Sequence, residues 1–115
     1  MAQSVKKLYA DTCQMCGLQL QTAAGTYSEV AHIRPLGIPH NGPDSLNNLL
    51  CLCPNCHTQF DGHALSVAPD GTVLRFGVPV GKLVVNARHE LDFSQLAYQS
   101  EISSGKSQKS STEDL

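Results

Sequence analysis

Hydrophobic and polar positions alternate most regularly in the stretch YSEVAHIR, residues 27–34. A two-residue period of this kind predicts a strand, because successive side chains point to opposite faces. Glu29 and Ala31 then share one face, while His32 and Arg34 share the other. The proline that follows Arg34 is expected to end the strand.

A continuous apolar run, LLCL at residues 49–52, predicts a second strand, which should be buried. The residues that follow predict a short helix from Pro54 to Asp61. Proline suits the first helical position, and Gly62 suits the position just past the end. His57 and Asp61 are four residues apart, so they should lie on one face of this helix.

The rest of the chain predicts a hairpin, a further strand and a last helix. Residues 64–67 and 72–76 flank the sequence Pro-Asp-Gly, which is a strong turn signal. Residues 82–86 are typical of a strand. Ser94 is expected to cap a helix that runs to about Ile102.

The length of 115 residues allows one small domain, which we place at residues 11–103. Residues 1–10 are expected to be a lead-in or linker, and residues 104–115 a disordered polar tail. Apolar residues make up 41% of the chain and tryptophan is absent, so a bound metal ion would add stability to a small core. Between the two predicted strands, residues 37–45 are rich in Gly, Pro and Asn and predict a loop, whose Asp44 or Ser45 can cap a helical turn.

No stretch approaches the roughly eighteen apolar residues that a membrane-spanning helix needs. The first residues carry no apolar signal-peptide core behind their charges. We therefore expect a cytoplasmic protein, whose thiols stay reduced and available to metal.

Four of the five cysteines form two Cys-x-x-Cys pairs, Cys13 with Cys16 and Cys53 with Cys56. Two such pairs in one chain predict a structural zinc site with four thiolate ligands, because zinc prefers tetrahedral sulfur coordination. Cys51 lies in the apolar run and is expected to be a small buried hydrophobe outside this site.

The net charge of −2 and the pI near 6.2 are not typical of a tight DNA-binding protein. Either the intrinsic affinity for nucleic acid is weak or another domain supplies it. Among the basic residues, Arg34 and Arg88 are candidates for phosphate contacts, and His89 is a third.

Three motifs, EVAHIRPL, NNLL and LCPNCH, follow one another in an order that resembles the HNH endonucleases. The resemblance implies an α+β fold, the small ββα-metal domain, here with a Cys₄ zinc knuckle pair, a following β-hairpin and a C-terminal helix. The motifs CQMCG, HNGPDS and VVNARHELD are in addition similar to the HNH half of SRA–HNH restriction enzymes. Those enzymes depend on DNA modification, and their N-terminal SRA domain recognises modified cytosine. The implied partners are double-stranded DNA, an SRA-like domain and, in a homodimer, a second copy.

The resemblance also implies roles for three residues. His32 would be the general base for an attacking water, since a neutral imidazole suits that task. His57 would hold a catalytic Mg²⁺ or Mn²⁺, which acts as a Lewis acid at the scissile phosphate. Asn48 cannot titrate and would hold the backbone or ring of His32 in place.

One position departs from the common pattern of the family. The residue before the base is often an Asp or His that binds the catalytic metal, and here it is Ala31. Asp61, which shares a helix face with His57, is one candidate replacement ligand. Glu29, on the same strand face as Ala31, and His40, in the glycine-rich loop, are two others.

A second function, from a different class, is compatible with the same residues. A zinc-stabilised module that binds DNA or protein without cutting would also need the four thiolates. The acidic net charge and Ala31 favour this alternative, whereas His32 and the His57/Asp61 pair favour the nuclease. The motifs assign no role to His63.

Overall fold

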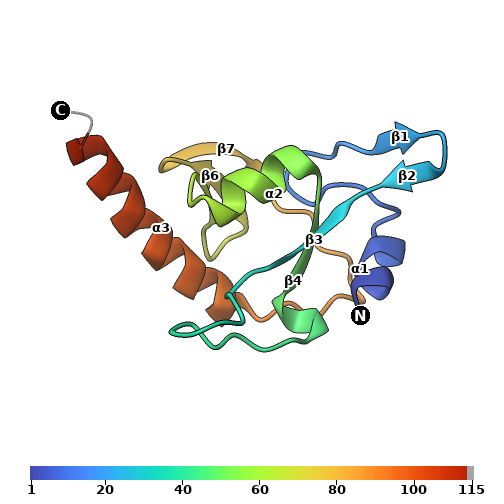
Figure 1. Ribbon diagram of the computed structural model, residues 1–115, viewed down its shortest axis with the longest axis horizontal. Helices are drawn as coiled ribbons and strands as arrows, with labels where there is room; N and C mark the ends of the chain where they lie inside the picture. Colours follow the sequence, from blue (N-terminus) through green and yellow to red (C-terminus); the bar gives the residue numbers. More distant parts are fainter. Residues whose placement is uncertain (114–115) are drawn as a thin grey trace.

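The computed structural model describes the backbone of residues 1–113 and the side chains of residues 1–105. The polar tail predicted for residues 104–115 lies, from residue 106 onward, outside the residues described in full. The helices and strands, in chain order, are α1 (Ala2–Leu8), β1 (Leu20–Thr22), β2 (Gly25–Tyr27), β3 (Glu29–His32), η1 (a 3₁₀ turn, Leu46–Asn48), β4 (Leu49–Leu52), α2 (Pro54–Asp61), β5 (Leu65–Val67), β6 (Thr72–Arg75), β7 (Val78–Lys82) and α3 (Phe93–Glu113) (Figure 1).

The centre of the fold is an antiparallel strand pair with a helix packed against it. β3 pairs with β4 so that Glu29 lies opposite Leu52 and His32 lies opposite Leu49. α2 follows β4 directly and packs against both strands (Figure 1). The predicted ββα arrangement and the α+β class are confirmed.

β4 is buried on both faces, which explains its uninterrupted apolar sequence. Leu50 and Leu52 join the main core together with Phe60 of α2. Leu49 and Cys51 point to the opposite face and pack in a second cluster. The strand therefore separates two small cores.

The second core is closed by the N-terminal segment. Val5 of α1 is 1% exposed and packs with Leu49, Cys51 and Tyr9. The lead-in predicted for residues 1–10 therefore contains a helix that packs on the central strands. This helix was hard to predict because Val5 is its one buried residue.

The predicted hairpin is confirmed, since β5 and β6 pair antiparallel across the Pro-Asp-Gly turn. The next strand was predicted at residues 82–86 but lies earlier, in β7. Phe76 and Gly77 both adopt positive φ, of 48° and 80°, and reverse the chain directly after β6. This tight turn brings Val78 opposite Arg75, so the third strand begins at once.

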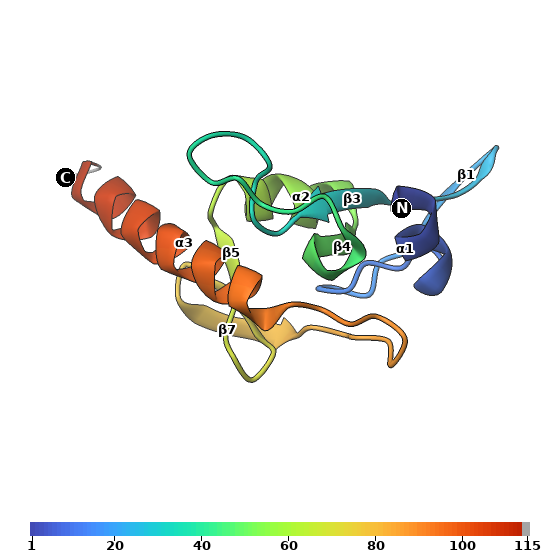
Figure 2. The same ribbon diagram turned by 90° about the horizontal axis from the view of Figure 1, so that it is seen from below.

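α3 packs against β5. Its cap is Asp92, whose Oδ1 accepts a hydrogen bond from the backbone N–H of Ser94 at 3.0 Å, so Ser94 is not the cap that was predicted. Leu96 is buried in the main core, and β5 lies between α2 and α3 (Figure 2). In the described part of the chain, no helix is long and apolar enough to cross a membrane.

Candidate active site and metal centre

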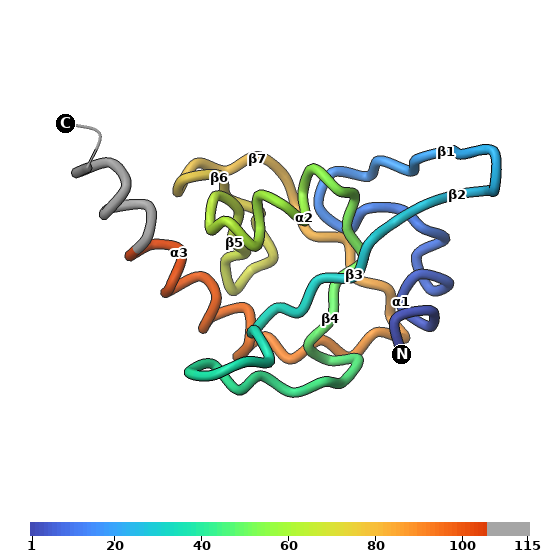
Figure 3. Tube along the Cα trace, viewed as in Figure 1, coloured from blue at the N-terminus to red at the C-terminus, as the bar shows by residue number. Residues whose placement is uncertain are grey.

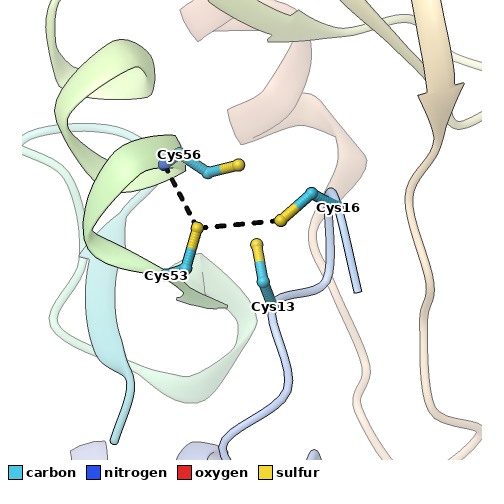
Figure 4. A group of neighbouring side chains, drawn as sticks. All are labelled: Cys13, Cys16, Cys53 and Cys56. Atoms are coloured by element: carbon cyan, nitrogen blue, oxygen red, sulfur yellow. Dashed lines mark hydrogen bonds between the residues drawn. The ribbon is translucent and has the colours of Figure 1, made fainter. Parts of the chain in front are cut away.

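The four cysteines of the two Cys-x-x-Cys pairs converge on one point (Figure 4). Their sulfur atoms all lie within 4.8 Å of one another, and the Sγ atoms of Cys16 and Cys53 are 3.7 Å apart. In a tetrahedron with metal–sulfur bonds of about 2.3 Å, neighbouring sulfurs are about 3.8 Å apart. The cluster therefore has the donors and the spacing to hold a metal ion such as zinc.

Local backbone features bring these thiols together. Gly17 adopts a φ of +79°, and its N–H donates to the carbonyl of Cys13, which closes the first turn. Cys53 is the N-cap of α2, where its Sγ accepts from the N–H of Cys56. Gln14 is buried and ties the first turn to β4, because its Oε1 accepts from the N–H of Cys51 at 2.8 Å.

The electrostatics of the cluster favour a bound cation. Burial, followed by the charge of the Cys13 thiol, raises the pKa of Cys56, and burial is also the main cause of the raised pKa of Cys16. Metal binding requires thiolates, so an ion would have to displace these protons. A bound divalent cation would offset the repulsion between thiolates that lie this close together.

Cys51 is buried and lies outside the four-cysteine cluster, as predicted. We expect Cys51→Ala to keep its metal content and to lose about 0.5–1.5 kcal/mol of stability, as for the loss of one buried methyl group. Metal analysis and chemical unfolding measure both effects. Loss of metal from Cys51→Ala, with retention by Cys53→Ala, would contradict this ligand assignment.

Three of the candidate residues, His32, His57 and Asp61, line one cavity of about 570 Å³ between β3, α2 and α3, which we call the catalytic cavity. His32 comes from β3, and His57 and Asp61 from α2. Apolar side chains, His63 and two residues of α3 complete the lining, which comprises Val30, Ile33, Pro35, Leu36, Phe60, His63, Gln99 and Ile102. The strand, the helix and the C-terminal helix thus bring together groups that are far apart in the sequence.

His32 is oriented by a carboxylate that had been assigned only a capping role. Its Nε2 lies 3.1 Å from Oδ1 of Asp44, which belongs to the loop between β3 and β4. An ionised carboxylate can only accept, so Nε2 carries a proton and Nδ1 of the neutral ring carries the lone pair. Ser45 occupies the N-cap position of η1, but its side chain makes no capping bond.

His57 lies between two carboxylates. Its Nδ1 is 2.8 Å from Oε1 of Glu29, and its Nε2 is 3.1 Å from Oδ2 of Asp61. The hydroxyl of Tyr27 donates to the other oxygen of Glu29 at 2.6 Å. This hydrogen bond and then the His57 ring lower the pKa of Glu29, which is therefore an ionised acceptor.

These contacts give Glu29 and Asp61 different roles. The Glu29 carboxylate accepts the Nδ1 proton of His57, which leaves Nε2, on the side of Asp61, as the ring nitrogen that a cation could bind in place of a proton. A cation at His57 can bind only one ring nitrogen, and the two carboxylates flank opposite nitrogens. His57 Nε2 with Asp61 is thus the candidate ligand pair, and Glu29 orients the ring.

Ala31 and His40 do not line the catalytic cavity. Ala31 is fully buried in the main core. The Nδ1 of His40 lies 2.6 Å from the hydroxyl of Tyr98 on α3. Of the three possible replacements for the missing ligand, the structure brings Asp61 and Glu29 to His57 and leaves His40 apart.

The candidate phosphate-binding residues occupy different sites. Arg34 follows β3, next to residues that line the catalytic cavity. Arg88 lines a separate cavity of about 650 Å³ beside α1. His89 is 5% exposed, and its two nitrogens face the Tyr9 hydroxyl and the Leu46 carbonyl, so it is a structural bridge and not a phosphate ligand.

His63, to which the motifs assigned no role, lines the catalytic cavity just after α2. His63 adopts a φ of +67°, whereas Gly62, at the end of the helix as predicted, has a φ of −84°. The Nδ1 of His63 lies 3.3 Å from the hydroxyl of Ser103 on α3. The sequence offered no signal for this placement, because it depends on how α3 packs.

The chain between β3 and β4 makes a long excursion before it returns (Figure 3). Asn48 holds this loop at both ends. Its Oδ1 accepts from the N–H of Arg34, and its Nδ2 donates to the carbonyls of Arg34 and Pro43, each at 2.9 Å. The sequence predicted that Asn48 would hold His32, which lies two residues before Arg34 in the chain. Gly42 permits the close approach of the loop, since a Cβ there would lie 2.1 Å from the Arg34 carbonyl oxygen.

We expect Asn48→Ala to lower the free energy of unfolding by about 1–3 kcal/mol, because it leaves buried backbone groups unpaired. Urea unfolding measures the effect. The matched control is Asn47→Ala, which changes an exposed side chain one residue earlier and should stay within about 0.5 kcal/mol of wild type. Equal stability of the two variants would show that the Asn48 side chain does not hold the loop.

Comparisons with known proteins agree with this geometry. Residues 13–68 match the model of a family described as HNH endonuclease. A solved structure titled "Modification dependent TagI restriction endonuclease" superposes with a TM-score of 0.83 at 42% sequence identity, covering 85% of this chain and 35% of that one. No curated protein matches the chain.

The matched segment contains both cysteine pairs, the ββα unit and every residue of the candidate catalytic group. The resemblance to the HNH endonucleases seen in the motifs is therefore confirmed for residues 13–68. The chain is similar to about a third of the length of the restriction endonuclease. α3, from which Gln99 and Ile102 line the cavity, lies outside the family match.

Proposed function

We propose that this chain is a metal-dependent endonuclease domain that hydrolyses phosphodiester bonds of double-stranded DNA. One observation carries the proposal: a carboxylate-oriented His32 and the His57/Asp61 pair line the same cavity. A base and a cation site on facing elements are what hydrolysis of a phosphodiester needs. The family match and the restriction endonuclease neighbour support the same reaction class.

His32 is the proposed general base. With its Nε2 proton donated to Asp44, the ring presents the Nδ1 lone pair to a water at the scissile phosphate. Proton transfer to Nδ1 makes an imidazolium, which the Asp44 carboxylate stabilises. Asp44 therefore acts on the orientation and charge of His32 and does not itself take up the proton.

His57 Nε2 and Asp61 are the proposed ligands of a catalytic Mg²⁺ or Mn²⁺. Such an ion supplies Lewis-acid neutralisation of phosphate charge. Two protein ligands are enough for Mg²⁺, which commonly completes its shell with water and substrate phosphate oxygens. Glu29 fixes the ring orientation, and the separate four-cysteine cluster binds structural zinc.

We propose that another domain recognises the DNA substrate. The net charge of −2 leaves this chain few phosphate contacts, so its binding to DNA should be weak and sensitive to salt. An N-terminal or separate SRA-like domain would raise cleavage by raising the effective DNA concentration.

Plasmid nicking tests the proposed function. The zinc-loaded protein should convert supercoiled plasmid to nicked circles with Mg²⁺ or Mn²⁺ and should stop when EDTA is added. Modified and unmodified plasmid are both needed, because the neighbour is modification-dependent. Absence of metal-dependent nicking on both substrates would instead favour the zinc-stabilised binding module, an alternative that the buried Ala31 and the acidic net charge support.

A further inference from the structure

Arg34 is held more firmly than a solvent-exposed arginine. Both its backbone N–H and its carbonyl are bonded to the side chain of Asn48, each at 2.9 Å. Its Nε donates to the carbonyl of His40 at 2.6 Å. The guanidinium carbon lies 4.0 Å from the centre of the Tyr98 ring, which is close enough for a cation–π contact.

Tyr98 is fixed in turn by His40. Its hydroxyl lies 2.6 Å from Nδ1 of His40, and the two rings meet edge to face with centroids 5.7 Å apart. Arg34, His40 and Tyr98 thus form a closed cluster, which we call the Arg34 platform. Its members come from the end of β3, the loop between β3 and β4, and α3.

The Arg34 platform lies at the edge of the catalytic cavity. Ile33 and Pro35, on either side of Arg34 in the chain, both line the cavity, as does Gln99, which follows Tyr98. In the part of the chain that the structure describes, no ion pair includes Arg34. Its Nε is the one guanidinium nitrogen for which a hydrogen bond is found there, which leaves the two terminal NH₂ groups for a ligand.

We propose that the Arg34 guanidinium binds a DNA backbone phosphate at the edge of the catalytic cavity, with Tyr98 and His40 as positioning residues. A planar fork of N–H donors matches two phosphate oxygens, and stacking on an aromatic ring leaves that fork accessible at its edge. Fixing the side chain beforehand reduces the entropy lost on binding. The inference rests on the proposed nuclease function for its substrate class, but its test needs no cleavage.

The test is DNA binding by His32→Ala protein, measured with a fluorescent duplex over a series of salt concentrations. Arg34→Ala in this background should weaken binding and reduce the slope of log K against log salt by about 1, the loss of one phosphate contact. Arg75→Ala is the matched control, since it removes the same charge from an exposed position outside the cavity lining. This control should keep the slope.

Two further variants test the positioning role. Tyr98→Leu removes the ring face and should weaken binding and reduce the salt slope, with zinc content unchanged, whereas Tyr98→Phe restores the ring and should recover both. Arg34→Lys keeps the charge but lacks the fork, so it should bind less tightly than wild type. Equal slopes for Arg34→Ala and Arg75→Ala, wild-type binding by Tyr98→Leu, or no duplex binding at low salt would each overturn the proposal. A protein that binds as expected but does not nick plasmid would overturn the nuclease function alone.

Discussion

Replacement of Cys13 by serine is expected to unfold most of the domain and to release one zinc ion per chain. Cys13 is 2% exposed and, with Cys53 and Cys56, belongs to the main hydrophobic core. The cluster ties the first turn to the start of α2, so its loss separates the elements that position the catalytic group. Apparent binding free energies of structural zinc are about 10–16 kcal/mol, as large as the roughly 5–15 kcal/mol that stabilises a whole domain.

Metal analysis and thermal unfolding measure this effect together. Cys51→Ala is the matched control, because it also alters a buried cysteine but lies outside the cluster. The control should keep its zinc and most of its melting temperature, and Cys13→Ser should keep neither. Absence of zinc from the wild type, or unchanged melting of Cys13→Ser, would contradict the structural role of the cluster.

Local patterns predicted the centre of the fold well. The two-residue alternation before Pro35, the apolar run of residues 49–52 and the proline-led helix after it are all found where the sequence placed them. Each of these signals lies within about ten residues, so backbone geometry alone connects pattern and structure. The two Cys-x-x-Cys spacings also sufficed to predict that the four thiols converge, since two such pairs are typical of a zinc site.

Contacts between distant segments could not be predicted in the same way. The pairing of His32 with Asp44 depends on how a long loop returns to β3, and Asn48 sets that return by bonding Arg34 and Pro43. The packing of α1 and of α3 depends on side chains in other elements. β7 was misplaced because a turn at Phe76 with positive φ has no common sequence signal.

The catalytic assignment also predicts a large effect, which separates the base from the metal ligand. His32→Ala should retain zinc, fold and Mn²⁺ affinity and lose about 10² to 10⁴ in cleavage rate, the usual contribution of a general base. His57→Ala should also lose cleavage, but through weaker Mn²⁺ binding, because Nε2 of His57 is the proposed ligand. Mn²⁺ titration of the zinc-loaded, folded variants separates the two cases.

The carboxylates around His57 supply the matched comparison. Asp61→Asn should weaken Mn²⁺ binding as His57→Ala does, since Asp61 lies beside Nε2, the proposed ligand atom of His57. Glu29→Gln should weaken it less, because the amide oxygen can still accept the Nδ1 proton and keep the ring oriented. The Mn²⁺ affinity should therefore be highest for wild type and His32→Ala, lower for Glu29→Gln, and lowest for Asp61→Asn and His57→Ala. A reversed order of the two carboxylate variants would place the ion on Nδ1 of His57, beside Glu29. Equal loss of Mn²⁺ affinity from His32→Ala and His57→Ala would show that His32 binds the metal and is not a free base.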